Sequence, residues 1–290
     1  MDSTRLTIRG ADGLLLAADV LGADGAPPVV LAHGAGQTRY AWRRAGEQIA
    51  SAGYRAVLFD LRGHGDSEWA SDGEYGIDAF TGDCIQIARW CGTPPAFIGA
   101  SLGGIAGLMS EGLVAPGTFS SLTLVDIAPN MDASGAMRIL GFMGTHVENG
   151  FATLQEAADV IASFLPHRTR PTDLTGLEKN LRLSEDGRYR WHWDPRMLEG
   201  FAGAGDPNRS ERLVQAARNL RLPVHLVRGQ SSELVSEEGA RQFLELVPTA
   251  RFTDVPRAHH MVAGDRNDAF IDAVLAFLAS LRSREVQGPA

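Results

Sequence analysis

The chain has 290 residues, of which 44% are hydrophobic and 21% are charged, a composition typical of a globular protein with a sizeable core. Its formal net charge is −8, from 35 acidic and 27 basic side chains, and no basic stripe is interleaved with aromatic residues, which argues against nucleic-acid binding. No apolar run approaches the length that crosses a bilayer and no secretory signal is apparent, so we expect a cytoplasmic protein without a membrane partner.

The two cysteines, Cys84 and Cys91, stand seven positions apart in one predicted helix. That spacing separates them by about 10 Å along the helix axis, beyond the limit of about 7 Å for a disulfide. We therefore expect reduced core cysteines, which agrees with a cytosolic location.

After an initial hairpin, buried strands alternate with helices. The turn at residues 10–13 joins the first two strands in an antiparallel pair. The alternation that follows indicates a parallel, doubly wound sheet. The predicted strands cover residues 6–8, 14–20, 29–32, 56–60, 97–100 and 122–127, and the predicted helices cover residues 40–51, 78–90 and 105–113.

The alternation stops over residues 129–212, where amphipathic helical stretches such as residues 154–164 are interrupted by prolines. This pattern predicts an inserted, mainly helical cap. Residues 1–128 and 213–290 then form the core, an α/β domain with an eight-stranded, mostly parallel sheet. Its second part is predicted to hold helices at residues 210–219, 237–246 and 267–281 and strands at residues 224–227 and 251–255.

An apolar strand ending at residue 100 runs directly into a Gly-x-Ser-x-Gly turn that opens a helix. A serine in such an elbow has a strained backbone, so its neighbours two positions away must lack bulk, as Gly99 and Gly103 do. The pattern predicts that Ser101 stands exposed above the sheet as a nucleophile. The alternative is a glycine-rich turn in which the serine only caps the helix.

A serine nucleophile needs a histidine base, and catalytic groups of open α/β sheets gather at the carboxyl ends of strands. After the last predicted strand, residues 256–261 offer His259 and His260. We prefer His260 as the base, because the loop is then long enough to return over Ser101. His259 remains the alternative.

The base needs an acid that orients it. Glu233 follows the strand at residues 224–227 and is our predicted acid. The nearby Glu237 and Glu238 are better explained as first-turn carboxylates behind the helix cap Ser236. Asp126, at the end of the strand after the serine helix, is the competing candidate; otherwise it supports the cap entrance through a structural hydrogen bond.

The oxyanion of the reaction needs backbone donors. We expect them from the amide of Leu102 and from the loop at residues 33–37, where small residues allow close approach. Ala35 is the predicted second donor, with Gly34 and Gly36 as rivals. His33 is expected to fix this loop.

Four motifs, in this order along the chain, resemble the α/β-hydrolase superfamily, and the resemblance spans nearly the whole chain. They are His33-Gly34-Ala35-Gly36, Asp60-Leu61-Arg62-Gly63-His64-Gly65-Asp66-Ser67, Gly99-Ala100-Ser101-Leu102-Gly103-Gly104 and His260. The chain is most similar to the capped branch that includes small esterases, lactonases, carbon–carbon bond hydrolases, epoxide hydrolases and cofactor-free perhydrolases. The resemblance implies an acid at Glu233 and a base at His260, and a structural role for the second motif. Epoxide hydrolases carry Asp where this chain has Ser101, so epoxide opening is disfavoured.

The predicted cap is rich in bulky apolar residues, which we expect to form either an acyl pocket or the cap's own core. The segment from Tyr189 to Trp193 alternates as on a short strand, so that one of its faces could line the pocket. The predicted substrate-binding residues are Gly34, Trp42, Phe142, Trp191 and Trp193.

The sequence thus predicts a serine hydrolase that cleaves a small, largely apolar carboxylic ester or lactone through an acyl-enzyme, with no metal or organic cofactor. A carbon–carbon bond hydrolase or a cofactor-free perhydrolase would use the same residues. A ligand receptor or pseudoenzyme with the cap as a switch is the alternative from another class. The sequence indicates no particular oligomeric state.

Overall fold

The computed structural model describes residues 3–168, 170, 172–201 and 207–287. Its centre is an eight-stranded sheet in the order β1-β2-β4-β3-β5-β6-β9-β10, in which β2 runs antiparallel to both neighbours and every other pair is parallel. The predicted fold class is confirmed. The strands are β1 (Thr4–Arg9), β2 (Leu15–Leu21), β3 (Pro28–Ala32), β4 (Arg55–Phe59), β5 (Ala96–Ala100), β6 (Ser121–Val125), β9 (Val224–Gly229) and β10 (Arg251–Val255).

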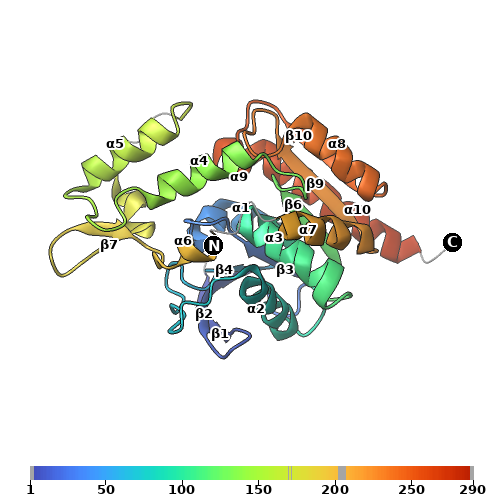
Figure 1. Ribbon diagram of the computed structural model, residues 1–290. Helices are drawn as coiled ribbons and strands as arrows, with labels where there is room; N and C mark the ends of the chain where they lie inside the picture. The colour runs from blue at the N-terminus through green and yellow to red at the C-terminus, as the bar shows by residue number, and fades with distance from the viewer. Residues whose placement is uncertain (1–2, 169, 171, 202–206, 288–290) are drawn as a thin grey trace.

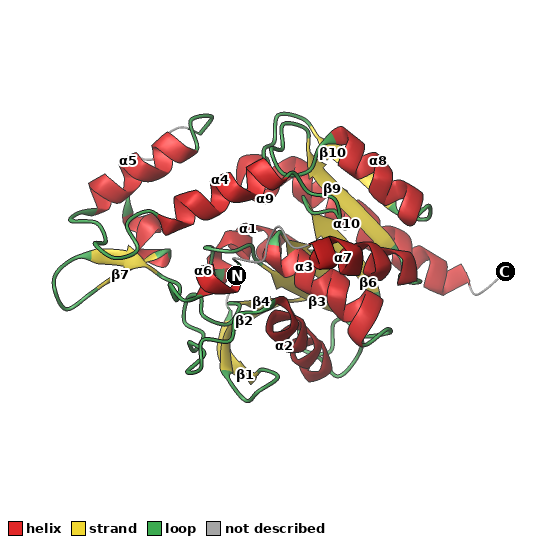
Figure 2. Cartoon of the chain, in the orientation of Figure 1, coloured by secondary structure: helices red, strands yellow, loops and turns green. Residues whose placement is uncertain are grey.

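Helices cover both faces of this sheet (Figure 2). Buried residues of α1 (Arg43–Ser51) and α10 (Asn267–Gln287) belong to one hydrophobic core. Those of α2 (Ile77–Trp90), α3 (Leu102–Met109), α7 (Pro207–Asn219) and α8 (Glu237–Leu246) belong to the other. Two cores form because the central parallel strands are apolar on both sides. In the described part of the chain, no helix is both long and apolar enough to cross a membrane.

The strand order places a topological switch at β3 and β5. From β3 the chain passes through α1 to β4 on one side, and from β4 it passes through α2 to β5 on the other side of β3. The loops that leave the carboxyl ends of β3 and β5 therefore diverge, which opens a crevice in sheets of this kind. Residues 33–37 and Ser101 lie at this crevice.

The predicted cap corresponds to the described residues between β6 and α7, which Figure 1 shows set to one side of the sheet, with α5 and β7 far from the C-terminus. Two of its helices begin at side-chain caps, since Asp132 accepts from Gly135 N and Thr153 accepts from Glu156 N. A two-stranded hairpin accompanies the helices. The elements are α4 (Ala133–Gly144), α5 (Leu154–Phe164), a 3₁₀ turn (Thr175–Lys179), β7 (Leu181–Leu183), β8 (Tyr189–Trp191) and α6 (Met197–Gly200).

The predicted boundary between cap and core at residue 212 falls inside α7, which packs on the core. A Cβ on Gly112 would lie 2.3 Å from Ala216 O of α7, and Asn219 Nδ2 donates to Gly112 O at 2.9 Å. The division into core and cap stays a prediction. We keep the name cap for α4 to α6 with the hairpin.

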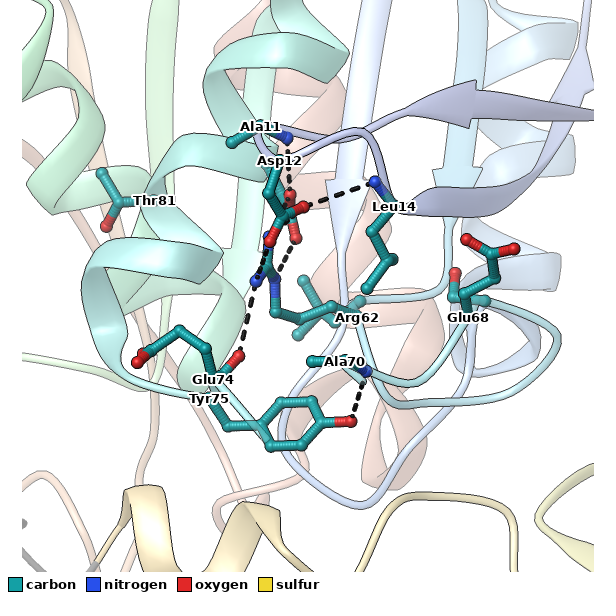
Figure 3. A network of polar contacts seen from close by, with 12 residues as sticks. Ala11, Asp12, Leu14, Arg62, Glu68, Ala70, Glu74, Tyr75 and Thr81 are labelled. Carbon is teal, nitrogen blue, oxygen red and sulfur yellow. Dashed lines mark hydrogen bonds and ion pairs between the residues drawn. The ribbon is translucent and has the colours of Figure 1, made fainter. Parts of the chain in front are cut away.

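The turn at residues 60–67 attaches the cap to the core. Arg62 is buried and pairs with Asp83 at 2.6 Å. It also donates to Asp12 and to Glu74 O (Figure 3). Two backbone hydrogen bonds of 2.8 Å join this turn to the segment after β8. The amide of Gly65 donates to His192 O, and the amide of Asp194 donates to Gly63 O.

The two cysteines lie on α2 and at its end. Cys84 is buried, Cys91 is half-buried, and both are free. Burial raises the pKa of Cys91 to about 11, so this thiol stays protonated near neutral pH.

Candidate active site

Ser101 stands between β5 and α3 in a backbone conformation that residues with a side chain rarely adopt. Its φ is 48° and its ψ is −118°. The flanking glycines are required, because a Cβ on Gly99 would lie 2.6 Å from Gly103 O and a Cβ on Gly103 would lie 2.6 Å from Ala32 O. The serine side chain makes no capping hydrogen bond to α3, so the alternative of a helix cap is wrong.

His260 lies in the loop after β10 and is held by Asp126. Its Nδ1 donates to Asp126 Oδ2 at 2.7 Å. Asp126 follows β6, is fully buried, and accepts from Gly229 N at 3.0 Å and from Ser232 Oγ at 2.5 Å. A carboxylate on Nδ1 fixes the tautomer that leaves a lone pair on Nε2, the arrangement a general base needs.

Glu233 does not contact His260 among the described residues, so the geometry contradicts the expected Glu233–His260 pair. Its Oε1 lies 3.5 Å from Arg138 Nη2, and its Oε2 lies 3.8 Å from His259 Nδ1. The loop turns this way because the Ser232 hydroxyl accepts from the amides of Leu234 and Val235 while it donates to Asp126. The loop after β9 thus directs Ser232 toward the buried carboxylate and Glu233 toward the cap.

Ser101 and His260 line one cavity of about 530 Å³ between the sheet edge and the cap. No hydrogen bond joins Ser101 Oγ to His260 among the residues that the structure describes. Catalytic hydrogen bonds are often long or poorly aligned without substrate and tighten when it binds. His259 lines the same cavity, but its ring stacks on His167 at a centroid distance of 3.7 Å.

Of the three candidate donor amides in the loop after β3, two already donate a hydrogen bond within the protein. Gly34 N donates to Gln37 Oε1 and Gly36 N donates to His64 Nε2, each at 3.0 Å. Within the described residues, the amides of Ala35 and Leu102 have no hydrogen-bond acceptor. Gly34 itself lines the cavity, and a Cβ there would lie 3.2 Å from Ser101 Cβ.

Two buried histidines fix this loop. His33 Nδ1 donates to Gly34 O at 2.8 Å, and its Nε2 accepts from Leu61 N at 3.0 Å. His64 Nδ1 donates to Arg62 O, which leaves Nε2 as the acceptor for Gly36 N. Burial lowers the pKa of His33 to about 4 and that of His64 to about 3, so both rings are neutral at pH 7 and can accept these bonds.

The cap supplies an apolar wall to the cavity. Phe142 of α4 stacks on Phe164 of α5 at 4.0 Å and meets Trp191 of β8 edge-on at 5.7 Å. The five expected binding residues all line the cavity, although Trp42 is 2% exposed and its ring centroid lies 5.6 Å from that of Phe270. Further apolar lining comes from α4, from α5 and from the residue that follows α5: Ile139, Met143, Ile161 and Leu165.

Two polar features of the site were missed. Ser232 stands beside Glu233, and only its contact with Asp126 distinguishes it from other loop serines. Arg168 and Asp265 form an ion pair at 2.6 Å next to the His260 loop. These two residues are far apart in the sequence, and no motif marks either of them. The one sequence signal for the pocket residues of α5 is the amphipathic pattern of that helix.

Comparisons with known proteins agree with this fold. The family model described as "Alpha/beta hydrolase family" matches residues 29–273. The esterase Rv0045c of Mycobacterium tuberculosis is 30% identical over 260 residues, which cover 87% of this chain and 83% of the relative. The 3-hydroxybutyrate-oligomer hydrolase of Cupriavidus necator is 28% identical over 256 residues, 82% of this chain and 84% of the relative. The crystal structure of an alpha/beta hydrolase from Novosphingobium aromaticivorans superposes with a TM-score of 0.81 at 23% identity and covers 96% of this chain and 98% of its own.

Proposed function

Because the chain belongs to the alpha/beta hydrolase family, we propose that it is a serine hydrolase that cleaves a small, largely apolar carboxylic ester or lactone through an acyl-enzyme intermediate. The observation that carries the proposal is the 2.7 Å hydrogen bond from His260 Nδ1 to the buried Asp126, at a cavity that Ser101 also lines. The similarity to an esterase over most of both chains supports ester bonds as the target.

In the proposed reaction, Ser101 Oγ attacks the carbonyl carbon while His260 Nε2 takes the hydroxyl proton. The tetrahedral intermediate collapses when His260 returns that proton to the leaving alcohol, which leaves Ser101 acylated. Water, deprotonated by His260, then releases the acid. Asp126, in place of Glu233, orients the imidazole and stabilises its charged form, as a buried carboxylate on Nδ1 does in such triads.

We assign the oxyanion hole to the amides of Leu102 and Ala35. This assignment is supported by the hydrogen bonds of the rival amides, because those of Gly34 and Gly36 already donate to acceptors within the protein. Leu102 N also lies at the first turn of α3, where amides lack intrahelical partners and the helix dipole favours negative charge. Loss of one such donor typically costs about 10²- to 10³-fold in kcat.

The substrate class follows from the lining of the cavity. Its volume of about 530 Å³ lies within the range of about 300 to 1,000 Å³ typical of small-molecule sites. The aromatic cluster of Phe142, Phe164 and Trp191 offers an apolar surface to the acyl group. A medium-length aliphatic or aromatic acyl chain would bury more of this surface than acetate does, so we propose that kcat/KM rises with acyl length until the cavity is filled.

The experiment is a kinetic series with p-nitrophenyl esters of graded acyl length, run beside Ser101→Ala and a fluorophosphonate probe. We expect wild-type turnover, covalent labelling at Ser101, and loss of both in S101A, with activity reduced at least about 10³-fold. Equal melting temperatures would show that S101A is folded. Ester turnover that survives in S101A would overturn the assignment. Ligand binding without turnover of any ester would favour the receptor alternative, and peracid formation from acetate and peroxide would favour the perhydrolase.

A further inference from the structure

One ion pair holds the backbone on both sides of His260. Asp265 Oδ2 accepts from His259 N at 2.8 Å, and Asp265 Oδ1 accepts from Arg168 Nε at 2.6 Å. Arg168 Nη2 reaches Met261 O at 3.4 Å. The residue before His260 and the residue after it are therefore tied to the same two side chains.

The two members of this pair come from different parts of the molecule. Arg168 follows α5 in the cap, whereas Asp265 ends α9 (Val262–Asp265) in the core. The Asp265 side chain is 5% exposed and that of Arg168 is 30% exposed, so the pair is largely shielded from water. The guanidinium packs directly against the backbone at position 264, because a Cβ on Gly264 would lie 2.6 Å from Arg168 Nη2.

A second cap contact lies beside the pair. The rings of His167 and His259 stack with an interplanar angle of 13°, and His167 Nε2 lies 3.4 Å from Asp265 Oδ1. The cap thus touches the His260 loop through a charged hydrogen bond, a backbone hydrogen bond and a ring stack. Charge-assisted hydrogen bonds are the stronger ones, so Arg168 dominates this contact.

The orientation of His260 depends on where its loop lies. Its ring has one described hydrogen bond, to Asp126, and that bond fixes Nδ1 without fixing how close Nε2 comes to Ser101 Oγ. The remaining freedom is removed by the backbone, which Asp265 and Arg168 hold at positions 259 and 261. A displacement of about 1 Å in such a group can cost about 10²-fold in rate.

We infer that Arg168 of the cap, acting through Asp265, positions His260, so that the catalytic base is aligned with Ser101 only while the cap is docked on the core. This inference rests on the proposed function and adds a role for the cap beyond lining the acyl pocket. Arg168 and Asp265 are positioning residues. The chemistry still belongs to Ser101, His260 and Asp126.

The test compares Arg168→Gln, Arg168→Lys and Asp265→Asn with wild type in kcat, KM and the rate at which a fluorophosphonate probe labels Ser101. We expect kcat and the labelling rate to fall together by about 10- to 100-fold in R168Q while KM changes less than about threefold. R168K keeps a cation for Asp265 but loses the fork that reaches Met261 O, so partial recovery is expected. D265N removes the charge and should resemble R168Q. R168K and D265N keep the test decisive if R168Q does not fold.

The matched control is Arg196→Gln. Arg196 also joins the cap region to the core, because it donates to the carbonyls of Ala70 and Ser71 and pairs at 2.6 Å with Asp194, which accepts from the Tyr75 hydroxyl. Among the described residues it has no contact with the His260 loop. Positioning predicts near wild-type kcat in R196Q, whereas a general loosening of the cap would lower kcat in R196Q and R168Q alike. Equal losses, or a change in KM alone, would overturn the inference. Failure of the wild type to label at Ser101 would instead overturn the proposed function.

Discussion

The Asp126 carboxylate has donors on both oxygens although it is fully buried. Gly229 N serves Oδ1, while Ser232 Oγ and His260 Nδ1 serve Oδ2. A buried carboxylate is costly unless it is hydrogen-bonded in this way. Asp126 also has a φ of 51°, so its backbone is strained, and such strain is typical of residues held for function.

We predict that two isosteric substitutions, Asp126→Asn and Glu233→Gln, have unequal effects on kcat/KM. The amide of D126N can present N–H to His260 Nδ1, which favours the tautomer that cannot accept the serine proton. We expect kcat/KM for a p-nitrophenyl ester to fall about 10⁴-fold in D126N and less than about threefold in E233Q. The reverse order of losses would restore Glu233 as the acid.

The sequence could name Ser101 and His260, but it favoured Glu233 over Asp126 as the acid, and only Asp126 contacts His260. β6 and β9 are neighbours in the sheet, so the residues that follow both strands arrive at the same edge. The choice depends on a loop of five residues, 231–235, where the Ser232 hydroxyl turns toward Asp126. Hydrogen bonds of this kind have no signature in spacing or composition.

Among the elements, α4 connects the pocket wall to the loop after β9. Gly135, in its first turn, lies against that loop, since a Cβ there would come 2.1 Å from Glu233 O. Gly141, two turns later in the same helix, has open space where its Cβ would be. Substitution of Gly135 therefore tests packing against the loop, and substitution of Gly141 tests helix propensity alone.

We predict opposite results for Gly135→Ala and Gly141→Ala. G141A should raise the free energy of unfolding by about 0.5 to 1 kcal/mol, because alanine loses less backbone entropy in a helix. G135A should push α4 away from residue 233 and lower the unfolding free energy by about 1 to 3 kcal/mol, as overpacking does. Urea unfolding of both variants checks this. Stabilisation by G135A would show that α4 shifts freely on the core.

The core elements could be predicted from the sequence because buried parallel strands are continuous apolar runs bounded by turn residues. The start of α3 was placed three residues late, at Ile105, because the apolar pattern does not show that the helix begins directly after the strained serine. In the cap, the alternation from Tyr189 indicated a short strand, and β8 lies there. Its partner β7 has three residues, too few for a pattern.

For the whole molecule, buried neutral histidines link stability to pH. His225 of β9 is buried, and burial lowers its pKa from the ordinary 6.5 to about 3. Below pH 6.5 the unfolded chain takes up a proton at this residue that the folded chain does not, so stability falls as the pH falls. Above pH 6.5 the two states are equally neutral there, and no penalty remains.

We predict that His225→Gln reduces this acid sensitivity. Between pH 7 and pH 5, His225 should cost the wild type about 2 kcal/mol of unfolding free energy, which H225Q would not lose. The measurement is the free energy of unfolding in urea at both pH values. His225 bonds to Thr253 Oγ1 and lies outside the catalytic cavity, so ester turnover at pH 7 serves as the control for correct folding. An identical pH dependence in both proteins would contradict the prediction.

The ion pair beside the His260 loop could not be predicted at all. Arg168 and Asp265 are 97 positions apart, in segments that the sequence assigns to different parts of the molecule. An ion pair of this kind becomes visible only when the path of the cap over the sheet is known.

The acid after β6 has a consequence for how this scaffold can change over time. In the proposed reaction Asp126 serves the imidazole, so the side chain at position 233 has no part in that reaction and instead meets the cap at Arg138. Substitutions at position 233 can therefore change the shape of the cavity entrance without changing the proposed proton transfer. A lineage built on this arrangement can acquire new substrates through the loop after β9 and keep its turnover chemistry unchanged.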